Sequence, residues 1–119
     1  MSPVAVLTAL MVKHFVCDFP LQNAYQYTNK GTYGHLGGVL HAYLHFLGTL
    51  EVCYYSELSM WWALFDAVVH YHVDWAKVRI NRRFGWGPSD SPFYWWLLGL
   101  DQLAHGLTYA FIMYMGGLI

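Results

Sequence analysis

The stretch MSPVAVLTALMVKHFVCDFP, residues 1–20, decides the fold. It is long and apolar enough to predict one helical pass through a bilayer, which takes about 20 residues. Pro3 is tolerated in the first turn of such a helix, and Pro20 ends it. The stretch nevertheless carries His14 and Asp18, one helical turn apart, where unpaired polar side chains are costly. The rest of the chain repeats this pattern.

The composition predicts a single small membrane domain, residues 1–119. Of these residues, 57% are hydrophobic and 11% are charged, against about 25% charged in a typical soluble domain. The aromatic content of 19% suits a protein with Trp and Tyr at the headgroups. A net charge of −1 gives no support for nucleic-acid binding. Cys17 and Cys53 are too few for a disulfide framework or a cysteine zinc site.

Four apolar segments predict an all-α fold, a four-helix transmembrane bundle. Continuous apolar runs favour helices over the alternating pattern of barrel strands. A Ser or Asp before Pro92 is expected to cap the last helix. The expected spans are about 2–19, 36–54, 59–79 and 92–116.

The charges predict the orientation of these spans. All six basic residues follow the first or third span, at its end or in the long loop after it, whereas Glu51 and Glu57 flank the short connection. The positive-inside rule then places both long loops in the cytoplasm and both termini outside. We therefore expect the lipid bilayer as a partner, with Arg82 and Arg83 as headgroup anchors.

Each predicted span carries one pair of metal-ligand-type side chains at positions i and i+4. Such spacing places both side chains on one face of a helix. The four pairs reach a common depth in the cytoplasmic half if the last two helices project beyond the bilayer. The pairs are His14 and Asp18, His41 and His45, His70 and Asp74, and Asp101 and His105.

Three interpretations of these eight residues compete. They can form interhelical hydrogen bonds that fix the register of the bundle, line a proton or ion pathway, or bind metal. We favour metal, because a divalent cation accepts neutral imidazoles and neutralises carboxylates. Eight donors exceed the four of one tetrahedral ion, which predicts two ions. The donor set leaves Zn, Fe and Mn open as the divalent transition metal.

Residues beside the eight candidates have supporting or unrelated roles. Asp66 precedes His70 by four residues, so we expect it to hold an imidazole tautomer from the second coordination shell. The alternative is a solitary polar residue paired elsewhere. His35 and His72 are not expected to be ligands.

The motifs together resemble one known family. They are His14-x3-Asp18-Phe19-x-Leu21-Gln22, His41-x3-His45, His70-x3-Asp74-Trp75-x-Lys77 and Asp101-Gln102-x2-His105. Nearly the whole chain is similar to a family of small bacterial and phage integral membrane proteins known as a domain of unknown function. The resemblance implies a multi-pass protein of a bacterial inner membrane, or that of a phage-infected host, but no activity. Its pattern adds Gln22 and Gln102 as second-shell positions, although Pro20 interrupts the helix before Gln22.

Three functions fit these expectations. The first is a metal-dependent hydrolase acting on a lipid or another membrane-associated ester or amide. No Ser or Cys stands beside a base, so a covalent nucleophile is not expected. The second is a di-iron oxidoreductase of the desaturase or hydroxylase kind, although HxxHH boxes are absent. The third is a non-enzymatic, metal-stabilised or metal-transporting phage or bacterial membrane protein.

Overall fold

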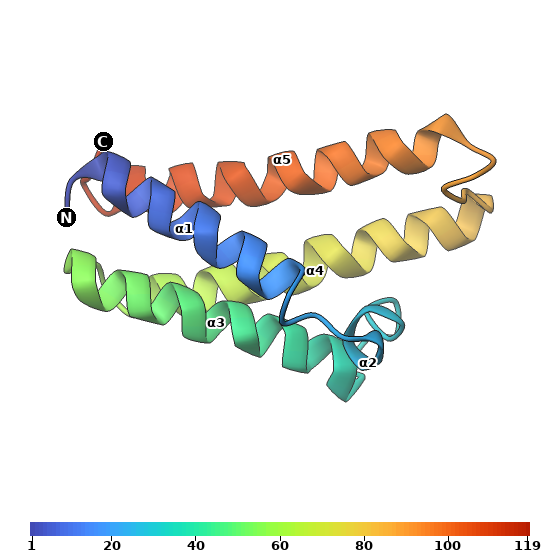
Figure 1. Ribbon diagram of the computed structural model, residues 1–119, viewed down its shortest axis with the longest axis horizontal. Helices are drawn as coiled ribbons and strands as arrows, with labels where there is room; N and C mark the ends of the chain where they lie inside the picture. The colour runs from blue at the N-terminus through green and yellow to red at the C-terminus, as the bar shows by residue number, and fades with distance from the viewer.

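The computed structural model describes residues 1–119 and contains five helices and no strand (Figure 1). The all-α prediction is confirmed. Four long helices occupy the regions in which spans are expected. A further short helix, α2, lies in the first long loop, where no helix is expected. The helices are α1 (Pro3–Asp18), α2 (Ala24–Tyr27), α3 (Leu36–Ser56), α4 (Trp61–Phe84) and α5 (Pro92–Met115).

Local chemistry sets the limits of the long helices. Ser2 and Ser91 each accept a hydrogen bond from a main-chain N–H in the first turn of α1 and α5, at 3.1 and 3.2 Å. A proline follows each cap, where its missing N–H is not needed. At the end of α4, Gly85 adopts a left-handed conformation with φ 66°, which glycine does at no steric cost.

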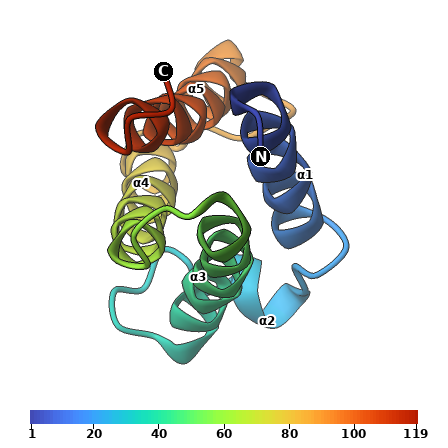
Figure 2. The same cartoon turned by 90° about the vertical axis from the view of Figure 1, so that its left-hand side faces the viewer.

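The four long helices surround a common interior (Figure 2). Both termini lie at one end of this bundle, and α4 and α5 continue past α1 and α3 at the other end (Figure 1). The segment with α2 lies at the end of α3 where that helix begins, and it packs against α3. This arrangement brings the last turns of α1 and the first turns of α3 beside the middle of α4 and α5.

The interior changes character along the bundle. Towards the termini it is apolar, with Val6, Leu10, Val52, Tyr109 and Met113 forming one buried cluster. Towards α2 the buried side chains are polar or charged. They include the following residues: Lys13, Asp18, Gln26, Lys30, His41, His45, Thr49, Asp66, His70, Asp74, Asp101 and His105.

The outer face of the bundle is mainly apolar. No charged residue of α1 or α5 is exposed, and Glu51 is the one exposed charge on α3. The exposed basic residues of α4, Arg79, Arg82 and Arg83, lie near its C-terminal end. Water-soluble domains place their charges outside, so α1 and α5, whose charged residues are all buried, depart from this distribution.

Judged by length and mean hydropathy together, none of the helices qualifies as one that could cross a membrane. The transmembrane part of the predicted fold class is therefore unsupported.

Candidate metal centre

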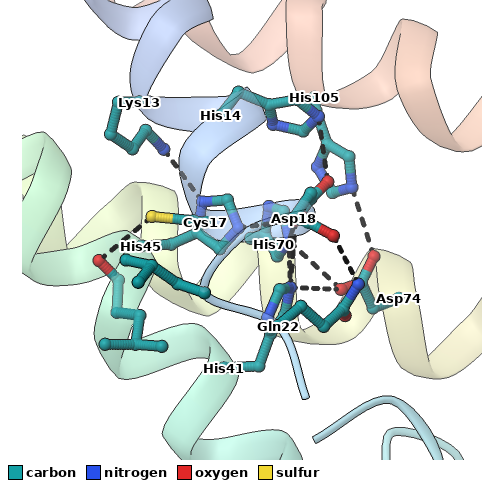
Figure 3. A network of polar contacts seen from close by, with 12 residues as sticks. Lys13, His14, Cys17, Asp18, Gln22, His41, His45, His70, Asp74 and His105 are labelled. Carbon is teal, nitrogen blue, oxygen red and sulfur yellow. Dashed lines mark hydrogen bonds and ion pairs between the residues drawn. The ribbon is translucent and has the colours of Figure 1, made fainter. Parts of the chain in front are cut away.

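The four predicted pairs converge in the polar part of the interior. Figure 3 shows seven of the eight side chains pointing toward one another across the bundle: His14, Asp18, His41, His45, His70, Asp74 and His105. The eighth, Asp101, lies with its Oδ1 3.2 Å from His105 Nε2. Seven of the eight side chains are buried, and His14 is half-buried. The structure thus brings together all the residues predicted as metal ligands.

Four ligand atoms meet at a first position. His41 Nε2 lies 3.2 Å from His70 Nε2. Asp18 Oδ1 is 3.1 Å from His41 Nε2 and 3.5 Å from His70 Nε2. Asp74 Oδ2 is 3.3 and 3.1 Å from the same two nitrogens. A tetrahedral ion with bonds of 2.0–2.2 Å separates its ligand atoms by roughly 3.3–3.6 Å, so these atoms are spaced almost as such an ion requires.

A second position lies beside the first. His105 Nε2 is 3.3 Å from Asp74 Oδ1 and 3.2 Å from Asp101 Oδ1. On the α1 side, His14 Nε2 lies 3.0 Å from Asp18 Oδ2. Asp74 therefore directs one carboxylate oxygen to each position, whereas Asp18 directs Oδ1 to the first position and Oδ2 to His14. A carboxylate that divides its oxygens between two positions is suited to bridging two ions.

A hydrogen bond behind the His41 imidazole fixes the orientation of that ring, as is typical of metal-binding histidines. Gln26, in α2, donates from Nε2 to the carbonyl of Leu21 at 3.0 Å. Its Oε1 therefore faces His41 Nδ1, at 3.2 Å. His41 donates its Nδ1–H to this oxygen, which leaves the Nε2 lone pair pointing into the first position.

The three predicted second-shell residues have different surroundings. Gln102 lies 2.9 Å from His14 Nε2 through its Oε1, and it donates to Asp101 Oδ2 at 3.0 Å. Asp66 contacts no imidazole and instead accepts hydrogen bonds from Lys13 and Thr49. Gln22 donates to the main-chain carbonyl of Asp18 at 2.6 Å and touches no predicted ligand side chain.

Sequence reasoning missed three lysines of the centre. Lys13 lies 3.0 Å from Asp66 Oδ2, Lys30 lies 3.1 Å from Asp74 Oδ2, and Lys77 lies 3.2 Å from Asp101 Oδ2. Their sequence positions suggested charges at a membrane surface. One signal was present, because Lys77 follows Asp74 by three residues and so shares its face of the helix.

The remaining histidines and the two cysteines make no contact with the predicted ligand side chains in the hydrogen bonds and ion pairs of the structure. His35 caps α3, with Nδ1 accepting from a main-chain N–H at 3.0 Å. His72 is exposed and lies 2.8 Å from the hydroxyl of Tyr33. Cys17 and Cys53 are free and buried.

The electrostatics of the first position call for a cation. In the neutral His41 ring, the lone pair of Nε2 faces one oxygen each of Asp18 and Asp74, so three acceptor atoms meet at this position. His70 Nδ1 is buried without a hydrogen-bond partner, whereas Asp74 Oδ2 and Asp101 Oδ1 have ion-pair contacts to Lys30 and His105, at 3.1 and 3.2 Å. Buried polar atoms without a partner are uncommon and costly. The donor set therefore fits a divalent ion, and two groups of buried side chains lie close enough to hold one: Asp18, His41, His45 and His70, and His70, Asp74 and His105.

These features define an all-α bundle with a buried His/Asp cluster that could hold metal. The chain belongs to the family described as Protein of unknown function (DUF3307), whose model matches residues 6–117. This match confirms the family of unknown function expected from the sequence motifs. No curated protein and no solved structure matches the chain.

Proposed function

We propose that this protein is a metalloprotein whose bundle core binds two divalent ions, with Asp74 bridging them. The observation that carries the proposal is the first position, where His41 Nε2 lies 3.2 Å from His70 Nε2. Asp18 Oδ1 and Asp74 Oδ2 each lie 3.1–3.5 Å from both of these nitrogens. Hydrogen bonds that only fix helix register would pair donors with acceptors. Here the lone pair of His41 faces acceptors instead, and a cation resolves that conflict.

The surroundings of the centre favour hydrolysis among the possible reactions. Lys30, Gly38, His41, Tyr71 and Asp74 surround a gap beside the first position that is too narrow for a water molecule in this structure. The ammonium of Lys30 lies at this gap, 3.1 Å from Asp74 Oδ2, and adds positive charge beside the proposed ions. Divalent ions supply acidity to water and stabilise charge on the oxygens of an ester. We therefore propose a metal-dependent hydrolase of a membrane-associated ester or amide.

We further propose that the outer face of the bundle contacts lipid. Its support is the distribution of side chains: large apolar residues cover α1 and α5 outside, and the charged residues of these two helices are buried. Ionisable residues within a membrane face the interior of a bundle in this way. Cell fractions washed with sodium carbonate test this proposal. Retention in the membrane pellet supports it, and release into the wash refutes it.

Metal analysis of the purified protein tests the proposed function. The parent protein and a His41→Ala variant are loaded with Zn²⁺, Mn²⁺ or Fe²⁺, passed through a desalting column and assayed for metal by mass spectrometry. His72→Ala is the matched control, because His72 is exposed and outside the centre.

Two zinc or manganese ions in the parent and in His72→Ala, with loss of at least one ion in His41→Ala, would support the hydrolase. Two iron ions with near-ultraviolet charge-transfer absorption would favour the di-iron oxidoreductase instead. Equal metal content in all three proteins, or none, would support the register-fixing role and refute a metal centre.

A further inference from the structure

Lys13 occupies the boundary between the apolar and polar parts of the core. Its side chain is 6% exposed and crosses α3 at Gly48, where a Cβ atom would overlap the Lys13 methylenes. The ammonium then lies 3.0 Å from Asp66 Oδ2, 2.9 Å from the Tyr109 hydroxyl and 3.0 Å from His45 Nδ1. An ammonium group has three donors and no acceptor, so each of the three partners receives one hydrogen.

This contact fixes the proton on His45. Because Nδ1 accepts from Lys13, the neutral imidazole carries its hydrogen on Nε2. That nitrogen lies 2.8 Å from Asp18 Oδ1, which is a hydrogen-bond distance and shorter than the other Nε2–carboxylate distances of the first position. A protonated nitrogen has no lone pair for a metal ion. His45 is therefore a donor to Asp18.

The same lysine fixes His14 through Tyr109. Since Lys13 donates to the Tyr109 oxygen, the phenolic hydrogen is free for His14 Nδ1, at 2.9 Å. His14 then carries its hydrogen on Nε2, which lies 2.9 Å from Gln102 Oε1 and 3.0 Å from Asp18 Oδ2. The Gln102 amide is oriented independently, because its nitrogen donates to the Asp101 carboxylate.

His41 provides the contrast within the same centre. Its Nδ1 faces the oxygen of Gln26, so its hydrogen lies on Nδ1 and its Nε2 is free. His41 and His45 are one turn apart on α3, and both are almost fully buried, at 2% and 0% exposed. Only the group behind each ring differs, and it gives the two rings opposite tautomers.

We propose that Lys13 is a positioning residue: it fixes the tautomers of His45 and His14 so that each donates a hydrogen bond from Nε2 to one oxygen of Asp18. Metal binding is then left to the other six of the eight predicted ligands. Those six are Asp18, His41, His70, Asp74, Asp101 and His105. The metal-binding part of this inference rests on the proposed function, whereas the tautomers do not. Asp66 and Thr49 anchor the lysine, with the Thr49 hydroxyl donating to Asp66 Oδ2 at 2.6 Å.

Nitrogen-15 NMR of the detergent-purified protein, labelled at histidine, tests the proposal. Two-bond nitrogen–proton correlations show which ring nitrogen carries the hydrogen, first without metal and then with Zn²⁺ added. His45→Gln, His14→Gln and His41→Gln assign the signals. The parent protein alone carries the main test, so the result does not depend on any variant folding.

We expect His45 and His14 to be protonated on Nε2 in both states, and only His41, His70 and His105 to show direct zinc coordination. In Lys13→Met, we expect the His45 hydrogen to leave Nε2 for Nδ1 in part or completely. Arg79→Met, which removes an exposed cation of α4, should leave the His45 tautomer unchanged.

Protonation of His45 on Nδ1 in the parent, or zinc bound to His45 Nε2, would overturn the proposal. An unchanged His45 tautomer in folded Lys13→Met would also overturn it. Expected tautomers in a protein that binds no zinc would uphold the role of Lys13 and refute the proposed metal centre. The two failures are therefore distinguishable.

Discussion

Replacing Asp74 by asparagine should weaken metal binding more than replacing any other single carboxylate of the centre by its amide. Asp74 is the carboxylate that approaches both positions: Oδ2 lies 3.1 Å from His70 Nε2, and Oδ1 lies 3.3 Å from His105 Nε2. Asparagine keeps the shape of the side chain but removes its charge. The variant therefore isolates the electrostatic contribution of the bridge.

The size of the effect follows from the distances. A unit charge about 4 Å from another contributes about 4 kcal/mol at an effective dielectric constant of 20. A ligand oxygen is closer than this to its ion, and the ion is divalent, but solvent and the neighbouring lysines reduce the gain. A loss of about 4 kcal/mol of binding free energy corresponds to a dissociation constant that is larger by roughly 10³-fold. We expect this change for at least one of two ions.

Competition with a chromophoric chelator measures the dissociation constants of the folded variant. Asp90→Asn is the matched control, because Asp90 is exposed and its Oδ1 accepts a hydrogen bond from a main-chain N–H in a loop. The control should bind two ions with unchanged affinity. If Asp74→Asn binds both ions as tightly as the parent, Asp74 does not bridge them and the reasoning is refuted.

Three further predictions follow from the same contacts. Lys30→Met should lower the metal dissociation constant at least tenfold in the chelator assay, because it removes an ammonium that lies 3.1 Å from Asp74 Oδ2 and competes with the metal for that oxygen. Unchanged or weaker binding would show that the Lys30 ammonium does not compete with the metal. Gly48→Ala should lower the free energy of unfolding by about 1–3 kcal/mol, as overpacking does, because the new Cβ overlaps the Lys13 side chain. Gly99→Ala is the control, because a Cβ there enters open space and should not lower the free energy of unfolding. Equal denaturation midpoints for the two variants would contradict this prediction. Zn²⁺ at about 100 times its dissociation constant should stabilise the folded protein by about 2.7 kcal/mol. This stabilisation would be measured as a rise in melting temperature that EDTA reverses. If the melting temperature does not rise, zinc does not bind the folded state in preference to the unfolded state.

Helix spacing alone predicted which residues meet in the core. The i and i+4 pairs share a helix face whatever the neighbouring helices do, so His70 and Asp74, or His41 and His45, had to point the same way. Their common depth was expected only if the last two helices project beyond the first two, and α4 and α5 do continue past α1 and α3 (Figure 1). The structure places all four pairs together, although their role as ligands remains a prediction.

The roles within the cluster could not be predicted in the same way. Lys13 lies beside His14 in the sequence, where it resembles a surface charge at the end of a membrane helix. Its actual partners, Asp66 and Tyr109, come from α4 and α5, and no local pattern indicates that contact. Gln26 belongs to a short helix in a polar loop, and only tertiary packing brings it behind His41. Long-range contacts of this kind decide which imidazole nitrogen carries a hydrogen.

The membrane expectation shows a different limit of sequence reading. Composition and positive charge asymmetry predicted four spans, but no helix has the length and apolarity for one. The polar residues that lower the mean hydropathy of the helices include those of the cluster, such as Asp101 and His105 in α5. A mean hydropathy along a helix does not record which face of the helix each residue occupies. The structure shows that the polar residues of the cluster lie on the inner face.

X-ray absorption at the metal edge of the purified, metal-loaded protein tests the central claim most directly. The account predicts imidazole nitrogen and carboxylate oxygen at about 2.0–2.2 Å, together with a metal–metal distance of about 3.5–4 Å. A spectrum showing only water or detergent oxygen around the ion, with no imidazole contribution, would contradict it.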